Sequence, residues 1–182
     1  MILNSELLER FFEINNFKDE ISVDYKEIED IDPDAFKNCR QRKIRSLRLT
    51  NPCDKSLLKI NSNHSSLFEP LKEHLEELNL SCHLQCDFNF LEHLHNLKKL
   101  TLSNSAFFNG KPLFQTANNQ LTHLSLSYCE LKISDKTMFN DLKCLKHLDL
   151  SEVTLMDNVL PELFKELKQL DTLKMIRTRL NP

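Results

Sequence analysis

Residues 121–131 read LTHLSLSYCEL, and residues 145–155 read LKHLDLSEVTL. The two stretches share leucines at their first, fourth, sixth and eleventh places, and most of the other residues differ. Side chains two residues apart point the same way on an extended strand, so the leucines at the fourth and sixth places share one face. Each stretch therefore predicts a short β-strand with one buried face.

The pattern Leu-x-x-Leu-x-Leu occurs six times in the chain. The copies are Ile44/Leu47/Leu49, Leu75/Leu78/Leu80, Leu97/Leu100/Leu102, Leu121/Leu124/Leu126, Leu145/Leu148/Leu150 and Leu170/Leu173/Met175. They start 22 to 31 residues apart, and the longest interval leaves room for a longer helix at about residues 65–74. Between other copies the apolar spacing becomes helical, as at Met138, Phe139 and Leu142 and again over residues 159–167. Each unit is therefore predicted to be a strand followed by a helical return.

A strand and a helical return repeated every 20 to 29 residues or so resemble the leucine-rich repeat superfamily. The resemblance covers residues 44–180, and it extends to the small residue and the aliphatic residue that follow the strand in that family. The complete or partial matches are Cys129/Leu131, Val153/Leu155 and Thr178/Leu180. The resemblance implies an α/β solenoid of horseshoe shape, with a concave parallel β-sheet and convex helices.

Caps are expected at both ends, because a terminal repeat would otherwise expose its core. Residues 1–43 are predicted to form an N-terminal helical cap, with Ser5 as the capping residue of a first helix and Pro33 at the start of a second. The apolar residues of the first helix are Leu7, Leu8, Phe11, Phe12 and Ile14. Residues 44–182 hold about six repeats. No helix follows Leu180, so the sequence favours a fragment of a longer protein.

Charge and composition argue against several classes of partner. The formal net charge is −3, which offers no general attraction to nucleic acid or to an anionic membrane. The basic stretch from Arg40 to Arg48 is interpreted as a solvated cap edge, neutralised by the acidic residues that precede it. The single glycine argues against a phosphate-binding loop, and no apolar run approaches transmembrane length.

The six cysteines are scattered, and the N-terminal residues lack the uncharged apolar stretch of a signal peptide. Free buried thiols are therefore expected, in a protein of the cytoplasm or the nucleus. Cys82, Cys86, His93 and His95 resemble a zinc site in residue type, but their spacing is not that of the usual zinc motifs. We therefore expect neither a bound metal nor a cofactor.

The residues between the leucines are expected to face outward on the concave side, in columns that cross strands about 4.8 Å apart. The candidate protein-binding residues are Glu77, Asn79, Lys99, Thr101, His123, Ser125, Tyr128, His147, Asp149, Thr172 and Lys174. His123, Ser125, His147 and Asp149 come close together in this arrangement, which raises the alternative of a hydrolase. A catalytic triad also needs an oxyanion hole and a pocket that excludes water, and an open sheet offers neither. The sequence therefore favours a non-enzymatic scaffold that binds a protein partner.

The phrases LTHLSLSYCEL and CLKHLDLSEVTL, the uneven repeat steps and the short Leu/Phe-rich cap resemble the Zyg-eleven and Zer-one family. That family supplies substrate-recognition subunits of cullin-2 ubiquitin ligases, so the resemblance implies elongin B/C and cullin-2 as partners. Pro112, Leu113, Ala117 and Leu121 fit the spelling of an elongin-binding box. Leu121 is also a core leucine of a repeat, so this fit is interpreted as accidental.

Overall fold

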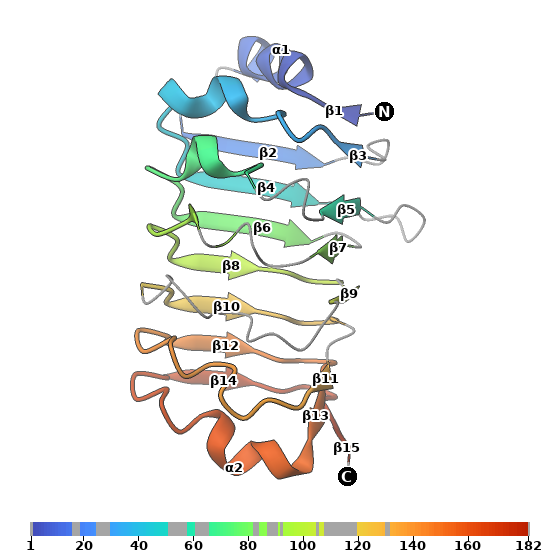
Figure 1. The fold of residues 1–182 in the computed structure, drawn as a ribbon, viewed down its shortest axis with the longest axis vertical. Helices are drawn as coiled ribbons and strands as arrows, with labels where there is room; N and C mark the ends of the chain where they lie inside the picture. Colours follow the sequence, from blue (N-terminus) through green and yellow to red (C-terminus); the bar gives the residue numbers. More distant parts are fainter. Residues whose placement is uncertain are drawn as a thin grey trace.

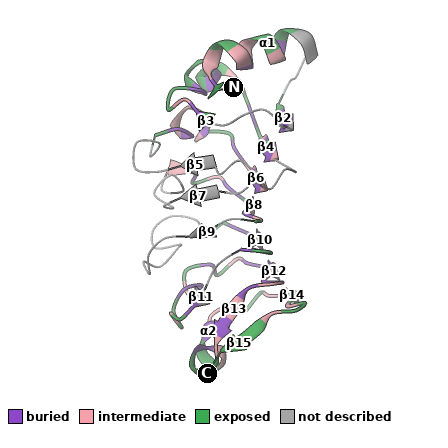
Figure 2. Cartoon of the chain, turned by 90° about the vertical axis from the view of Figure 1, so that its right-hand side faces the viewer, coloured by how far each residue is buried: buried purple, intermediate pink, exposed green. Residues whose placement is uncertain are grey.

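A seven-stranded parallel β-sheet forms one side of the computed structural model (Figure 1). The structure describes residues 2–15, 19–24, 30–50, 58–60, 66–81, 84–86, 91, 93–104, 106–107, 120–129 and 132–181. The strands follow chain order, and they are β2 (Glu20–Asp24), β4 (Ser46–Thr50), β6 (Glu77–Ser81), β8 (Lys99–Thr101), β10 (His123–Ser125), β12 (His147–Asp149) and β14 (Thr172–Lys174). Figure 2 shows that this sheet lines the concave side of an arc. The chain is therefore a leucine-rich repeat solenoid, as the sequence predicts.

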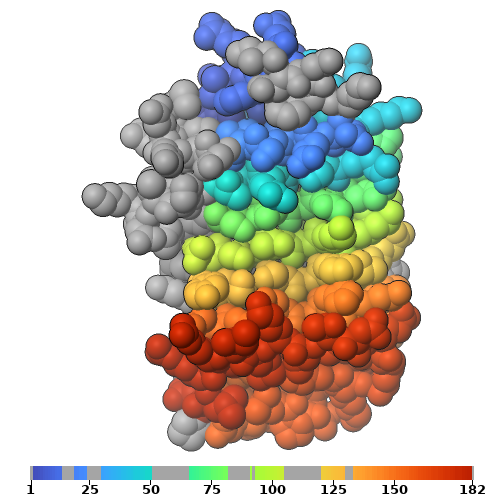
Figure 3. Space-filling model, turned by 180° about the vertical axis from the view of Figure 1, so that it is seen from behind, coloured from blue at the N-terminus to red at the C-terminus, as the bar shows by residue number. Residues whose placement is uncertain are grey.

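Each of the six copies supplies one strand of this sheet, from β4 to β14, and neighbouring strands pair with their leucines in register. Leu124 in β10 lies opposite Leu100 in β8 and opposite Leu148 in β12. Leu173 in β14 lies opposite Leu148 on its other side. In the space-filling view each repeat occupies one band across the molecule (Figure 3). The predicted strand positions and the predicted register are both confirmed.

The sheet begins within residues 1–43, the segment that the sequence predicts to be a helical cap. Strand β2 pairs with β4, and its buried Ile21 and Val23 lie opposite Leu47 and Leu49. The place of the first leucine in this copy holds Lys18, and the other two places hold isoleucine and valine. A search for leucines therefore misses this strand, although its burial pattern is the same.

Helix α1 (Ser5–Asn15) covers the N-terminal end of the solenoid (Figure 1). The side-chain oxygen of Asn4 accepts a hydrogen bond from the backbone N–H of Leu7 at 2.9 Å, so Asn4 is the N-cap. The prediction that Ser5 caps this helix is wrong by one residue, since Ser5 already lies inside the helix. Leu8 and Phe12 bury the inner face of the helix, as predicted.

Short parallel strands lie beside the C-terminal ends of the main strands (Figure 1). They form one two-stranded and two three-stranded sheets. These are β1 (Ile2–Leu3) with β3 (Asp30–Ile31), then β5 (Leu58–Ile60) with β7 (Leu84–Cys86) and β9 (Ala106–Phe107), and then β11 (Lys132–Ile133) with β13 (Thr154–Met156) and β15 (Arg179–Asn181). Within the two three-stranded sheets, successive repeats are thus joined by backbone hydrogen bonds at a second place besides the main sheet.

The return segments on the convex side are shorter and tighter than the predicted helices. They contain η1 (Lys37–Gln41), η3 (Glu69–Leu71), η5 (Asp157–Val159) and the four-residue helix α2 (Leu160–Leu163). The helix predicted to begin at Pro33 is wrong, and so is the helix expected at about residues 65–74, because turns and 3₁₀ segments occupy residues 33–41 and 66–74. A 3₁₀ helix rises about 2.0 Å per residue instead of 1.5 Å, so it crosses the solenoid with fewer residues. No helix in the described part of the chain is long and apolar enough to cross a membrane.

One continuous core runs through the solenoid. From β4 to β12, the leucine columns are at most 2% exposed. Phe36, Phe68 and Phe139 fill the convex side and are fully buried. Full burial of an aliphatic or phenyl side chain contributes about 1.5–3 kcal/mol, so these columns dominate the stabilising side of folding.

The small residue that follows the strand also bonds to the preceding repeat. The thiol of Cys129 donates to the carbonyl of Leu102 at 2.6 Å, and the hydroxyl of Thr178 donates to the carbonyl of Leu150 at 2.8 Å. Val153 takes the equivalent place without a donor and is fully buried. Cys129 and Thr178, two of the predicted turn residues, therefore also join neighbouring repeats by hydrogen bonds.

The basic stretch that begins at Arg40 makes ion pairs with other segments of the chain. The pairs are Arg40 with Glu69, Arg42 with Glu9 at 2.8 Å, and Arg45 with Glu76 at 3.0 Å. The guanidinium of Arg42 also lies over the ring of Phe12, at 4.0 Å from its centroid. Three of the five basic side chains in this stretch are therefore paired with glutamates of other segments. The side chains of Asp24, Glu27 and Glu29, in the acidic segment that precedes the stretch, lie outside the described residues.

The thiol of Cys39 is expected to react slowly in the folded protein. Burial raises its pKa from 9.0 to about 11, although the nearby Arg42 lowers it. Its contribution to stability is fully present below pH 9 and is lost as the pH rises toward 11, because only the unfolded chain ionises readily in that interval. Alkylation at pH 8, followed by site-resolved mass spectrometry, should label the half-buried Cys144 well before Cys39. Equal labelling rates would contradict this.

Candidate functional site

The in-register strands arrange the residues between the leucines in columns on the concave face. The first column is Ser46, Glu77, Lys99, His123, His147 and Thr172, and the second is Arg48, Asn79, Thr101, Ser125, Asp149 and Lys174. Ten of the eleven predicted site residues stand in these columns. Tyr128 is the exception, because it lies in the turn after β10.

Four charged residues of these columns form two ion pairs, one on each side of a centre made of imidazole and hydroxyl groups. The ammonium of Lys99 lies 2.6 Å from the carboxylate of Glu77, and that of Lys174 lies 3.2 Å from the carboxylate of Asp149. Burial alone would raise the pKa of Asp149, but hydrogen bonds from Ser151 and Lys174 outweigh it and lower the pKa. The paired charges leave imidazole and hydroxyl groups as the main polar groups of the centre.

Four hydroxyl residues in the centre form what we call the hydroxyl patch, namely Thr101, Ser103, Ser125 and Ser127. The hydroxyl oxygen of Ser127 lies 3.2 Å from that of Ser103 and 3.1 Å from that of Ser125. A hydroxyl group can donate and accept, so the patch can adapt to either kind of partner group. All four side chains are half-buried.

His123 and His147, here called the histidine pair, stand opposite each other in β10 and β12. Their rings stack with centroids 4.2 Å apart and planes inclined by 29°. Burial lowers the pKa of His123, and the nearby His147 and Lys99 lower it further. The charged form of this imidazole is therefore disfavoured.

The register brings His123, Ser125, His147 and Asp149 together as predicted, but their hydrogen bonds lead to other residues. Ser125 bonds to Ser127, Asp149 accepts from Ser151 and Lys174, and His123 contacts Thr122. Within the described residues, no hydrogen bond links serine to histidine or histidine to aspartate. The hydrolase alternative therefore gains no support from this geometry.

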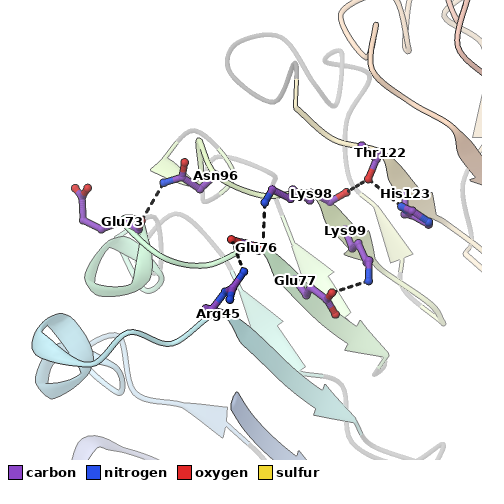
Figure 4. A network of polar contacts seen from close by, with 9 residues as sticks. All are labelled: Arg45, Glu73, Glu76, Glu77, Asn96, Lys98, Lys99, Thr122 and His123. Atoms are coloured by element: carbon purple, nitrogen blue, oxygen red, sulfur yellow. Dashed lines mark hydrogen bonds and ion pairs between the residues drawn. The ribbon is translucent and has the colours of Figure 1, made fainter. Parts of the chain in front are cut away.

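A third column, which we call the rim column, was not singled out from the sequence. It holds the residue directly after the first leucine of each copy, and its members from β4 onward are Arg45, Glu76, Lys98, Thr122, Lys146 and Asp171. The carbonyl of each member from Arg45 to Lys146 accepts two backbone N–H groups of the next repeat, as Glu76 does from Lys98 at 2.8 Å and from Lys99 at 3.0 Å. Glu76 also joins Arg45 and Lys98 by ion pairs (Figure 4). The sequence did contain a sign of these ion pairs, because Arg45, Glu76 and Lys98 alternate in charge at the same place of successive copies.

The turn after each of the last four main strands holds one residue with a left-handed backbone. These residues are Asn104, Tyr128, Glu152 and Arg177, with φ between 54° and 63°. A non-glycine residue in this conformation costs about 1–2 kcal/mol. Tyr128 is also 58% exposed, so an aromatic ring is held at the end of the concave face without a core role. The sequence has a single glycine, and of these four residues only Asn104 is of a type that favours the conformation.

Glycine at residue 152 is expected to give a more stable protein than alanine at the same place. Both changes remove the ion pair of Glu152 with Arg177, and only glycine accepts φ of 63° without strain. Urea melts of Glu152→Gly and Glu152→Ala should differ by about 1 kcal/mol in favour of glycine. Equal stability, or a more stable alanine variant, would contradict the left-handed turn.

The cysteines of the possible zinc group cannot be placed with the histidines. The side chains of Cys82 and Cys86 lie outside the described part of the chain. His93 is half-buried and His95 is exposed, both close to the start of β8. The expectation that this group binds no metal therefore stays a prediction.

No family model matches the chain. Among solved structures it is similar to the crystal structure of an internalin (inlF) from Listeria monocytogenes, with 15% sequence identity and a TM-score of 0.47. The alignment covers 86% of this chain and 57% of that one, so the chain spans a little over half the length of the internalin. The assignment of the repeat fold rests on the strand register and the leucine columns of the chain itself.

Proposed function

We propose that this chain is a non-enzymatic scaffold that binds a protein partner on its concave face. The observation that carries the proposal is the set of in-register columns, in which side chains of different charge and size stand on a rigid sheet fixed by the leucines. We place this scaffold in the cytoplasm or the nucleus, in keeping with the free thiols expected from the sequence.

Three groups on or beside this face suit a protein partner. The ion pairs of Lys99 and Lys174 flank the centre and can fix the register of a bound surface, because a mismatched partner would place like charges opposite each other. The hydroxyl patch and the histidine pair offer donors and acceptors for backbone or side-chain groups. Tyr128 adds an exposed aromatic ring, the kind of residue that often anchors protein interfaces.

The test is a comparison of charge-reversed variants of matched size. The double variant Lys99→Glu/Lys174→Glu alters the concave face, and Lys136→Glu/Lys143→Glu makes the same charge change on exposed return turns. Proteins captured by the wild-type chain are identified by quantitative mass spectrometry, and the affinity of a candidate partner is then measured with each purified variant. The proposal expects at least a tenfold loss of affinity for the concave variant only.

Two results count against the concave face. If Lys99→Glu/Lys174→Glu keeps full affinity while Lys136→Glu/Lys143→Glu loses it, the partner binds the convex side. If both variants bind as tightly as the wild type, charged residues of neither face contribute. Thermal melts of both variants must first show that the fold is retained, since Lys99 and Lys174 each form an ion pair.

A substrate-recognition role in a cullin-2 ubiquitin ligase is a second proposal. It is supported by the resemblance of the repeat phrases to the Zyg-eleven and Zer-one family and by no contact in the structure. Residues 112–117 of the possible elongin-binding box lie outside the described residues. Co-precipitation of the full chain with elongin B/C and cullin-2 tests it. Absence of both partners from the wild-type precipitate would end this proposal.

A further inference from the structure

Arg48 differs from the other charged residues of the two concave columns, because it joins no ion pair with a described side chain. It lies in the middle of β4 between the buried Leu47 and Leu49, and its side chain is exposed on the concave face. Lys99 and Lys174, by contrast, are each held by a carboxylate. The guanidinium of Arg48 therefore has its N–H groups available for a partner.

Asn79 stands directly opposite Arg48, in the neighbouring strand β6. Its side-chain oxygen accepts a hydrogen bond from the backbone N–H of Ser81 at 3.1 Å and another from the Ser81 hydroxyl at 2.5 Å. A backbone N–H can only donate, so the amide oxygen is turned toward Ser81 and the amide NH₂ group is left for a ligand. Arg48 and Asn79 thus offer N–H donors side by side, and a carboxylate accepts from both kinds of donor.

Two glutamates of the neighbouring strands stand on the same face and leave this place open. Glu20 in β2 is exposed and lies opposite Ser46, and among the described residues it forms no ion pair with Arg48. Glu77 in β6 pairs with Lys99 at 2.6 Å. The carboxylate that matches Arg48 is therefore expected to come from outside the described part of the chain.

Tyr128 is the second residue of this face that is suited to anchor a partner. Its side chain is 58% exposed, and its backbone N–H donates to the carbonyl of Ser151 at 2.9 Å. The ring therefore projects from a backbone that is already fixed, so little ordering is needed when a partner binds. Arginine and tyrosine are among the residue types that most often dominate the energy of protein interfaces.

The strands between the two anchors set the length of the segment that can reach both. Strands β6 and β8 separate β4 from β10, so Arg48 and the strand before Tyr128 are three steps apart (Figure 1). Three steps of about 4.8 Å give roughly 14 Å, and Tyr128 lies beyond the end of its strand. An extended chain rises about 3.3 Å per residue, so about four to five residues span the distance.

The hydroxyl patch, in and directly after β8 and β10, lies between the anchors. An extended segment has backbone N–H and C=O groups that need partners, whereas the backbone groups of a helix are bonded within the helix. Hydroxyl groups both donate and accept, so the patch can serve either backbone group. The surface between the anchors therefore suits an extended segment better than a helix.

We propose that the concave face binds an extended segment of the protein partner with two defined side chains. A carboxylate side chain accepts from Arg48 and Asn79, and an apolar side chain about four to five residues away packs on the ring of Tyr128. A phosphate group fits less well, because phosphorylated segments are usually bound by clusters of arginine. This assignment rests on the proposed scaffold function and adds the chemistry of the partner to it.

The test uses the full chain to select binders from a random peptide library displayed on phage. Peptides enriched by the wild type should share an acidic residue and a leucine or aromatic residue about four to five places apart. Arg48→Glu should reverse the charge preference and enrich lysine or arginine at the acidic place. Tyr128→Ala should remove the preference for the apolar residue. Arg10→Glu is the matched control, because Arg10 is exposed on the cap helix α1 and its loss should change nothing.

Affinities of a synthetic peptide of the enriched sequence give the size of each contact. Binding should weaken about tenfold or more in Arg48→Gln, the range for a hydrogen bond to a charged group. Thermal melts first establish that each variant is folded, and Arg48→Gln replaces Arg48→Glu in the selection if the latter fails. With Arg48→Gln, the acidic preference should disappear. A peptide with phosphoserine at the acidic place should bind no tighter, and clearly tighter binding would contradict the carboxylate.

The outcomes separate this assignment from the scaffold proposal. If the wild type enriches a pattern that the Arg48 variants leave unchanged, the extended acidic segment is overturned. The concave scaffold still stands in that case, provided that Lys99→Glu/Lys174→Glu abolishes the enrichment. A selection without any enriched peptide also overturns the segment, since an extended chain keeps its contacts as a peptide. The scaffold is then judged by its own captured partner.

Discussion

Replacement of Leu148 by alanine is expected to lower the free energy of unfolding by about 2–5 kcal/mol. Leu148 is 1% exposed and stands in the middle leucine column between Leu124 and Leu173. Removal of its buried methyl groups leaves a cavity that the two neighbouring strands cannot fill, because both are fixed by backbone bonds. Urea melts followed by circular dichroism measure the loss.

Leu173 provides the matched control for this change. It occupies the same place in its copy, but β14 is the edge strand of the sheet and Leu173 is 41% exposed. Leu173→Ala should therefore cost about 1 kcal/mol or less, since little buried surface is lost. If the two alanine variants were equally destabilised, the burial assigned to the leucine columns would be wrong.

Replacement of Phe68 by alanine is expected to cost about 3–5 kcal/mol, the range for a buried phenylalanine. The rings of Phe36 and Phe68 are fully buried and stack with centroids 5.7 Å apart and planes inclined by 30°. Phe36 belongs to the segment predicted as a cap, whereas Phe68 precedes η3 in the next return. The contact therefore makes the first strand-bearing unit part of the solenoid core.

A double-mutant cycle measures this contact directly. Phe36→Ala, Phe68→Ala and the double variant should show a coupling of about 0.5–1.5 kcal/mol, as expected for neighbouring aromatic rings. Hydrogen exchange in β2 should also accelerate in each variant. Additive losses with unchanged exchange in β2 would mean that the N-terminal unit folds apart from the repeats.

The strand positions and the concave columns could be predicted because the same pattern of buried leucines recurs along the sequence. Two leucines separated by one residue fix the inner face of each strand, and the common spacing fixes which strand residues stand opposite one another. The proximity of His123 and His147 follows from this register alone. Strand β2 was missed because its two buried places hold Ile21 and Val23 instead of leucine.

Other features depend on backbone geometry that the residue types do not mark. Apolar spacing cannot distinguish a helix from a tight turn, so the returns around Phe139 and Pro70 were predicted as helices. The left-handed conformation of Tyr128 is imposed by the path of the chain and not by a glycine. The bonds of Thr122 to Lys98 and His123 join two strands through side-chain geometry, which no sequence pattern contains.

Hydroxyl-radical footprinting of the chain with and without its captured partner tests the concave binding face most directly. His123, His147 and Tyr128 react readily with radicals and are half-buried or exposed on or beside that face. Phe164 and Met156 are half-buried away from it and serve as internal references. We predict protection of the two histidines and of the tyrosine, with unchanged labelling of Phe164 and Met156. Protection of Phe164 and Met156 alone would contradict the concave face as the binding surface.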